Sequence, residues 1–306
     1  MKVLFADEGR RVSISRRSCL SAVAVAAGVA LTTGLGPSWA KRPNYDHIIN
    51  LAGRQRMLSQ RMSKEIMLIA LQYNVRENVR NLGFSSEEFG RVLHGLRYGD
   101  GELALPATAE EAVLQRLSKV ESLWPAFKVL VMDAIEKKEV VPGQVKICAE
   151  ASLPLLKAMD DTVKAYERAA SAGNLSGILA IAINLAGAQR MLTQKASKEC
   201  YLIALDHEAA ANRKQLGQSI DRFERVLKGL LEGDTELRLM AAPTAPIKAQ
   251  LRTVERLWAE FQPMLSKVRD GGPVSPDVIA ETASLNLTLL GEMNTAVGMY
   301  EGLQAT

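Results

Sequence analysis

Residues 49–65 read INLAGRQRMLSQRMSKE, and residues 183–199 read INLAGAQRMLTQKASKE. The two segments lie 134 residues apart and are identical at 13 of 17 positions. The same offset pairs Trp124 with Trp258 and Tyr166 with Tyr300. It holds, without a gap, over roughly 120 residues, which indicates the duplication of a whole domain rather than a short repeat.

The composition of the chain favours helices. Hydrophobic residues make up 47% and charged residues 24%, as in soluble globular proteins. Good helix formers dominate, and alternating strand patterns are absent. Each copy divides into four helical segments with short connections, so we predict an all-α fold of two tandem antiparallel four-helix bundles related by the internal duplication. The predicted domains are residues 41–174 and 175–306, after a leader at residues 1–40.

The helix boundaries follow from local signals. The first helix of each copy is predicted at about residues 46–81 and 176–216, because apolar periodicity runs through both segments. Later helix starts are predicted at two capping boxes and at two prolines, namely Ser85-x-x-Glu88, Thr108-x-x-Glu111, Pro142 and Ser275-Pro276-Asp277.

The leader has the layout of an export signal. Arg16 and Arg17 precede a mildly apolar run at residues 22–35, and Ala40 closes a small-residue cleavage site. Paired arginines favour the twin-arginine route to the periplasm. The alternative is an uncleaved anchor, since residues 19–36 are just long enough to span a bilayer.

The charge and the metal-binding residue types exclude several classes of function. Residues 1–40 hold five basic and two acidic residues, so the rest of the chain carries only +1 of the total charge of +4. This near-neutral balance lacks the excess of positive charge with which proteins bind the phosphates of nucleic acid. The three histidines form no ligand spacing with each other or with the cysteines, so no metal or cofactor is expected. Without a nucleophile-and-base arrangement or a phosphate loop, we do not expect an enzyme.

Cys148 and Cys200 lie in helical patterns of different copies. The periplasm permits a disulfide, and two buried free thiols are an equal alternative.

The first helix presents two distinct faces. At 100° per residue, one stripe gathers large apolar side chains typical of a bundle core. Arg56 lies on a second face with small or polar neighbours that include Gly53 and Gln60, and the other copy repeats this face around Arg190. If the two first helices pack through these faces, Arg56 and Arg190 converge near a pseudo-two-fold axis. Two desolvated guanidiniums require a negative partner, and a small planar oxyanion matches their hydrogen-bonding forks.

Residues 49–60, INLAGRQRMLSQ, resemble the signature of the PilJ-type sensor domain at the N-terminus of type IV pilus chemotaxis receptors. They are also similar to the periplasmic domain of NarX-like nitrate/nitrite sensor kinases. The resemblance covers both copies, and it implies that the motif arginine, here Arg56 and Arg190, binds nitrate where two four-helix bundles meet. The kinases tend to have lysine after the Ile-Asn pair, whereas this chain has Leu51 and Leu185.

The leading hypothesis is therefore a periplasmic protein that binds or senses a small oxyanion, nitrate or nitrite first, and acts through a membrane receptor or kinase. The alternative is a ligand-free helical adapter in envelope or type IV pilus-linked signalling. Pairing of the copies within one chain or between the chains of a homodimer stays open. The predicted ligand-binding residues are Arg56 and Arg190, with Asn50, Asn184, Ser59 and Thr193 in support.

Overall fold

The computed structural model describes residues 43–171 and 176–304. Within these residues the chain forms eight α-helices and a final 3₁₀ turn. Their bounds are α1 Tyr45–Ala70, α2 Val75–Tyr98, α3 Glu111–Lys137, α4 Pro142–Ser171, α5 Ser176–Ala204, α6 Ala209–Glu232, α7 Ala245–Arg269, α8 Pro276–Glu301 and η1 Gly302–Gln304. The predicted leader lies outside the described residues.

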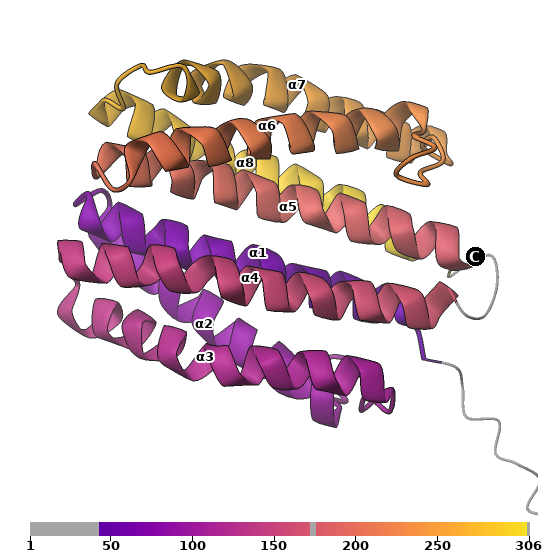
Figure 1. The fold of residues 1–306 in the computed structure, drawn as a ribbon. Coiled ribbons are helices and arrows are strands. Elements are labelled where there is room, and N and C mark those ends of the chain that lie inside the picture. Colours follow the sequence, from indigo (N-terminus) through magenta and orange to yellow (C-terminus); the bar gives the residue numbers. More distant parts are fainter. Residues whose placement is uncertain (1–42, 172–175, 305–306) are drawn as a thin grey trace, which may run out of the picture. The chain divides into compact units, whose positions relative to one another are not determined.

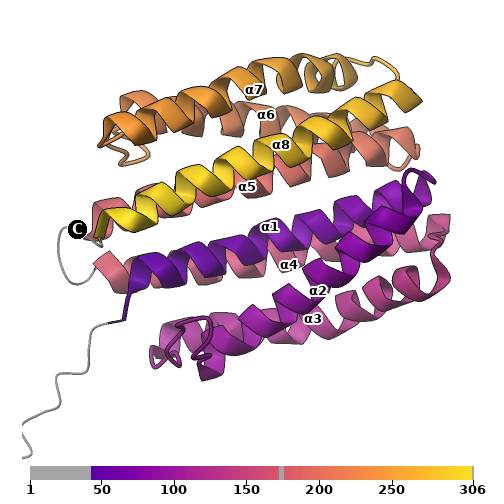
Figure 2. The same cartoon turned by 180° about the vertical axis from the view of Figure 1, so that it is seen from behind.

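The helices form two four-helix bundles, α1–α4 and α5–α8. In each bundle the first helix packs on the second and the fourth, and the third helix closes the ring. The bundles join side by side, with α1 and α5 in the middle (Figure 1), and the reverse view shows the same order (Figure 2). Helix α1 packs more extensively on α5 than on any helix of its own bundle. The fold class predicted from the repeat is confirmed, and the two copies pair within one chain.

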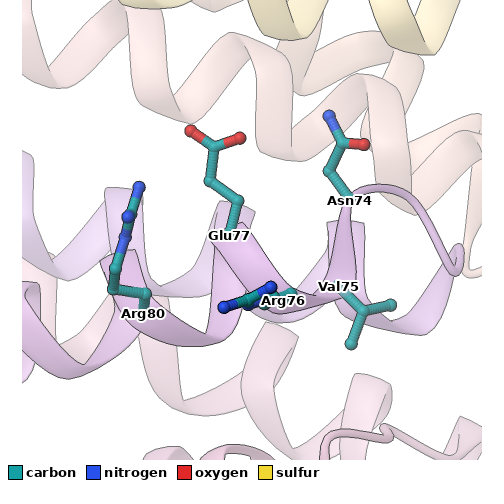
Figure 3. A pocket seen from close by; sticks show the side chains of 5 residues that line it. All are labelled: Asn74, Val75, Arg76, Glu77 and Arg80. Atoms are coloured by element: carbon teal, nitrogen blue, oxygen red, sulfur yellow. The ribbon is translucent and has the colours of Figure 1, made fainter.

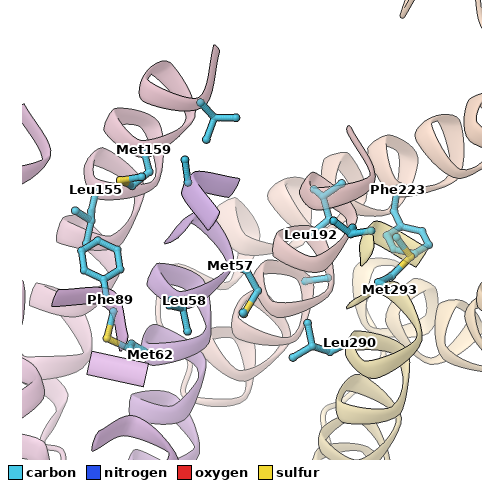
Figure 4. Packing of buried hydrophobic residues seen from close by; sticks show 14 of the residues in the cluster. Met57, Leu58, Met62, Phe89, Leu155, Met159, Leu192, Phe223, Leu290 and Met293 are labelled. Atoms are coloured by element: carbon cyan, nitrogen blue, oxygen red, sulfur yellow. The ribbon is translucent and has the colours of Figure 1, made fainter. Parts of the chain in front are cut away.

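The buried hydrophobic residues of the two bundles form one continuous cluster that includes residues of both α1 and α5. Figure 4 shows Phe89 and Met62 on one side of the α1–α5 pair and Phe223 and Met293 on the other. All four side chains are fully buried. Met62, which belongs to the predicted apolar stripe of α1, lies beside Phe89 of its own bundle, whereas Arg56 reaches across to α5.

The predicted first helix is too long. Helix α1 ends at Ala70, and α2 begins at Val75 after a tight turn in which Gln72 and Asn74 adopt positive φ angles of 57° and 43°. The equivalent turn between α5 and α6 places Asp206 and Glu208 at 53° and 44°. Neither turn contains glycine or proline, so the usual sequence signals for a break are missing.

Both predicted capping boxes are wrong. Ser85 lies inside α2, where its hydroxyl donates to Glu65, and the Thr108 hydroxyl donates to the carbonyl oxygen of Leu96 in place of capping α3. The two proline-based starts are confirmed: α4 begins at Pro142, and Ser275 caps α8 by accepting from the backbone N–H of Val278. A serine or threonine three residues before a glutamate is also compatible with a helix interior or a tertiary hydrogen bond.

Candidate functional site

Arg56 of α1 and Arg190 of α5 meet at the interface between the bundles, with exposed fractions of 2% and 3%. A methyl group placed on Gly53 would lie 3.3 Å from Nη2 of Arg56 and 3.8 Å from Nη2 of Arg190. One placed on Gly187 would lie 3.3 Å from Nη2 of Arg190 and 3.6 Å from Nη2 of Arg56. Both guanidiniums therefore converge beside the same two glycines, whose missing side chains leave room for them.

Each guanidinium also reaches across to the other helix. Arg56 donates through Nη2 to the backbone carbonyl oxygen of Asn184 at 3.0 Å. Arg190 donates through Nη2 to the carbonyl oxygen and the side-chain Oδ1 of Asn50, at 3.3 and 2.9 Å. This reciprocal pattern relates the two copies by a pseudo-two-fold axis, and it places both predicted asparagines beside the arginines.

Ser59 and Thr193 are fully buried, but their hydroxyl hydrogens are already used. Each donates to the backbone carbonyl oxygen of the arginine three residues earlier, at 2.8 Å in both copies. In this geometry the two hydroxyls stabilise the turn of helix that carries the arginine. A direct contact of either hydroxyl with a ligand stays a prediction.

The fourth helix of each bundle adds a residue that sequence reasoning missed. Asp160 of α4 accepts from Nη1 of Arg56 at 2.7 Å, and Asn294 of α8 accepts from Nη1 of Arg190 at 3.2 Å. The two residues are equivalent under the 134-residue offset. Burial acts to raise the pKa of Asp160, but Arg56 and Lys164 together outweigh it and hold this pKa below its ordinary value. Arg56 thus has a carboxylate partner, whereas Arg190 is bonded to neutral groups.

The electrostatics of Arg190 reflect this difference. Burial, followed by repulsion from Arg54 and Arg56, lowers the pKa of Arg190 to about 9, so it stays protonated at neutral pH. The Nε groups of Arg56 and Arg190 and Oδ1 of Asn184 are buried without a hydrogen-bond partner among the described residues. Buried donors of this kind normally have a partner. The site therefore presents two unused N–H donors and an excess of positive charge.

Two glutamates at the rim hold the asparagines in place. The side-chain amide of Asn50 donates to Glu301, and that of Asn184 donates to Glu167. Glu301 also pairs with Nδ1 of His47 at 2.6 Å. The glutamates are equivalent residues of the two copies, and their conservation under the 134-residue offset was a signal in the sequence that could have identified them.

A second polar layer lies two turns further along α1 and α5, and it too was missed. Lys64 donates across the interface to Asn286 of α8 at 2.9 Å, and Lys198 donates to Gln60 of α1 at 2.9 Å. Both lysines are buried, and burial is the main cause that lowers the pKa of each to about 8. The identical Ser-Lys-Glu at the end of both motifs was the available signal.

A surface groove of about 520 Å³ lies at the start of α2. Figure 3 shows Asn74, Glu77 and Arg80 rising from one side of the helix there. The groove lies beyond the C-terminal end of α1, whereas Arg56 lies in the first half of that helix. Its lining includes Arg76, Arg80 and Glu77, but these side chains are exposed, unlike the two buried guanidiniums between α1 and α5.

Three further features concern residues 43–171 and 176–304: metal ligands, membrane-spanning helices and the cysteines. No group of histidine, cysteine, aspartate and glutamate side chains there could hold a metal ion. No helix in this part of the chain has the length and apolar character needed to cross a membrane. Cys148 and Cys200 are buried free thiols, which answers the question the sequence left open.

The family comparison matches the same two segments that carry the repeat. The matching profile is PilJ, described as the N-terminal domain of type IV pili methyl-accepting chemotaxis transducers, and it covers residues 41–146 and 178–275. The chain belongs to the PilJ family. Two tandem matches agree with one PilJ unit per bundle.

Two comparisons with individual proteins point to one receptor. The chain is 32% identical over 117 residues to the methyl-accepting chemotaxis protein McpN of Pseudomonas aeruginosa. The match covers 38% of this chain and 21% of McpN, so it spans about a fifth of that receptor. The solved ligand-binding domain of McpN, described as a nitrate receptor, is 31% identical, with a TM-score of 0.35, and the match covers 39% of this chain and 92% of that domain.

Proposed function

We propose that this PilJ-family protein binds a small oxyanion, nitrate or nitrite first, between α1 and α5, and that Arg56 and Arg190 clamp it. The observation that carries the proposal is the convergence of two buried guanidiniums, each with an unpartnered Nε, beside two glycines. Guanidinium forks donate pairs of parallel hydrogen bonds to planar oxyanions. The relative McpN, to which the chain is 32% identical over 117 residues, is described as a nitrate receptor, and this supports the same ligand class.

The ligand must enter by a local opening of the interface, because both arginines are almost fully covered. Asn50 and Asn184 lie where they can guide it: each interacts with the opposite arginine and is held by a rim glutamate. Binding would replace the repulsion between two like charges with attraction to one anion. The bound state would then tighten the contact between the bundles, which is a change that a partner protein can read.

We further propose that the protein works in the periplasm, through a membrane receptor or kinase. The leader supports export, and the family is that of chemotaxis transducer sensor domains. The adapter hypothesis needs the arginine-bearing faces of α1 and α5 to be free for a protein partner. In the described structure each of these faces covers the other, which favours the ligand-binding role.

Thermal unfolding of the purified protein with nitrate, nitrite, sulfate or chloride at matched ionic strength tests the proposal. A ligand at 100 times its Kd adds roughly 2.7 kcal/mol to the unfolding free energy, which appears as a raised Tm. We expect nitrate or nitrite to raise the Tm of the parent and of Arg252→Ala, an exposed control on α7. Arg56→Ala and Arg190→Ala should lose the response. Equal responses in all four proteins would overturn the proposal, and no response to any anion would favour the adapter.

A further inference from the structure

The two halves of the arginine site have the same geometry and different charges. Asp160 and Asn294 are equivalent residues of α4 and α8, each 104 positions after its arginine, and each accepts a hydrogen bond from Nη1 of that arginine. One is a carboxylate and the other is a neutral amide. This pair therefore breaks the pseudo-two-fold symmetry of charge among the groups that contact the guanidiniums directly.

The neighbouring charges do not restore the balance. Arg190 is hydrogen-bonded to Asn294 and to Asn50, all through neutral oxygens. Glu301, the carboxylate beside Asn50, is itself paired with His47. Arg54 is paired with Glu88 at the surface.

On the other side of the site, Arg56 is paired with Asp160, whose second oxygen contacts Lys164 at 2.6 Å. The Lys164 side chain is 53% exposed, so solvent screens its charge. Among the direct hydrogen-bond partners of the two guanidiniums in the described residues there is thus one carboxylate, Asp160, whose side chain is 30% exposed, and Glu301 reaches Arg190 only through Asn50.

We propose that Asp160 and Asn294 set the valence of the ligand, so that the site takes a monovalent oxyanion and holds it closer to Arg190 than to Arg56. This inference rests on the proposed function. One added negative charge neutralises the two guanidiniums and the carboxylate, whereas a dianion leaves an uncompensated buried charge, which is strongly unfavourable. Asp160 carries a negative charge and Asn294 carries none, and through this difference the two residues determine the specificity of the site.

The experiment measures Tm without ligand and then the Kd for nitrate and sulfate by calorimetry, in four variants. Asn294→Asp supplies the missing carboxylate, so it should raise the ligand-free Tm and weaken nitrate binding by at least about tenfold. Asp160→Asn adds a net positive charge, so it should lower the ligand-free Tm and shift preference toward sulfate. The double swap Asp160→Asn with Asn294→Asp keeps the total charge and should restore nitrate binding. Asn294→Ala removes the hydrogen bond without adding charge and should cost far less affinity than Asn294→Asp.

Each outcome separates this inference from the proposed function. If the parent binds nitrate but Asn294→Asp binds it equally well, or if Asn294→Ala is as damaging as Asn294→Asp, the valence assignment is overturned and the anion site stands. A swap variant that fails to regain nitrate binding also overturns it. If the ligand-free Tm values shift as expected but the parent binds neither nitrate nor sulfate, the proposed function fails and the ligand class fails with it.

Discussion

Asp46 is buried near the start of α1, and neither of its carboxylate oxygens has a hydrogen-bond partner among the described residues. Burial, and then the charge of Glu301, raises its pKa to about 6. A carboxyl group whose pKa is raised on folding stabilises the folded state below its unfolded pKa of 3.8, and this contribution is lost as the pH rises through about 6. At neutral pH the folded protein therefore carries a buried, unpaired charge. The equivalent residue in the second copy is Ala180.

We expect Asp46→Ala to increase the unfolding free energy at pH 7 by roughly 1–2 kcal/mol, the usual cost of an unsatisfied buried polar group. The gain should shrink toward pH 4, which is well below the folded pKa of about 6, because the buried carboxyl is then protonated and no charge is buried. Urea denaturation at the two pH values measures this difference. An equal gain at pH 4 and pH 7 would show that charge burial is not the cause.

Gly53 and Gly187 provide the space in which the two arginines meet. A methyl group on either glycine would press against a guanidinium at 3.3 Å. We expect the double variant Gly53→Ala, Gly187→Ala to weaken nitrate binding about tenfold, because displaced guanidiniums lose their paired hydrogen bonds.

Gly83 of α2 is a suitable control for this change, since a methyl group there would contact nothing within 4 Å. Gly83→Ala should leave nitrate binding unchanged and stabilise the helix by about 0.5–1 kcal/mol. Calorimetric titration of both variants decides the matter. Unchanged affinity in the double glycine variant would contradict the proposed position of the ligand.

The sequence was sufficient to predict the arginine pair and the two asparagines beside it, but not the partners on α4 and α8. Helical periodicity placed Arg56 on a face of small residues, and the repeat supplied Arg190, so their convergence followed from the packing of two like faces. Asp160 and Asn294 are 104 residues further along the chain, and no local pattern links them to the arginines. Comparison of the copies position by position, with attention to where the charge differs, would have drawn attention to this pair.

At the scale of helices, the second polar layer, which contains Lys64 and Lys198, makes the contact between α1 and α5 depend on pH. Burial is the largest cause that lowers the pKa of Lys64 and Lys198 to about 8, below their ordinary value of 10.5. Between about pH 8 and 10 the unfolded chain therefore binds more protons than the folded one, and the unfolding free energy rises with pH. At pH 7 both lysines are charged in the interface, which is unfavourable.

We expect Lys64→Met to raise the unfolding free energy at pH 7 and to reduce its rise between pH 8 and 10. The partner Asn286 keeps its second donor, Gln194, at 2.9 Å, so this variant leaves that oxygen satisfied. Lys198→Met is the matched comparison: it removes the lysine that donates to Gln60 Oε1, so its gain at pH 7 should be smaller. Urea denaturation across the pH range tests both variants. If the unfolding free energy of the double variant Lys64→Met, Lys198→Met still rises by the same amount between pH 8 and 10, these amines do not titrate in the interface.

Helix boundaries were the least predictable part of the elements. The break between α1 and α2 depends on positive φ angles at Gln72 and Asn74 rather than on glycine or proline, so hydrophobic periodicity continued across it. The capping-box pattern at Ser85 failed because tertiary contact with Glu65 decides the role of that serine. Where the cap was reinforced by proline, at Ser275 and Pro276, the prediction was correct.

For the whole molecule, the duplication determines both the fold and the position of the candidate site. The sequence left open whether the two copies pair within one chain or between chains, because residue patterns alone do not distinguish these arrangements. The α1–α5 contact answers this: one chain holds both arginines and both asparagines. Covalent linkage of the two bundles is also what allows Asp160 and Asn294 to differ, since the copies in a homodimer must be identical.

Calorimetric titration of nitrate into the parent protein and into the double variant Arg56→Ala, Arg190→Ala tests whether the paired arginines hold the anion. We expect one nitrate per chain for the parent and no detectable binding to the double variant, with the far-ultraviolet helical signal unchanged between the two. Two nitrate ions per chain, or binding that survives loss of both arginines, would contradict this expectation.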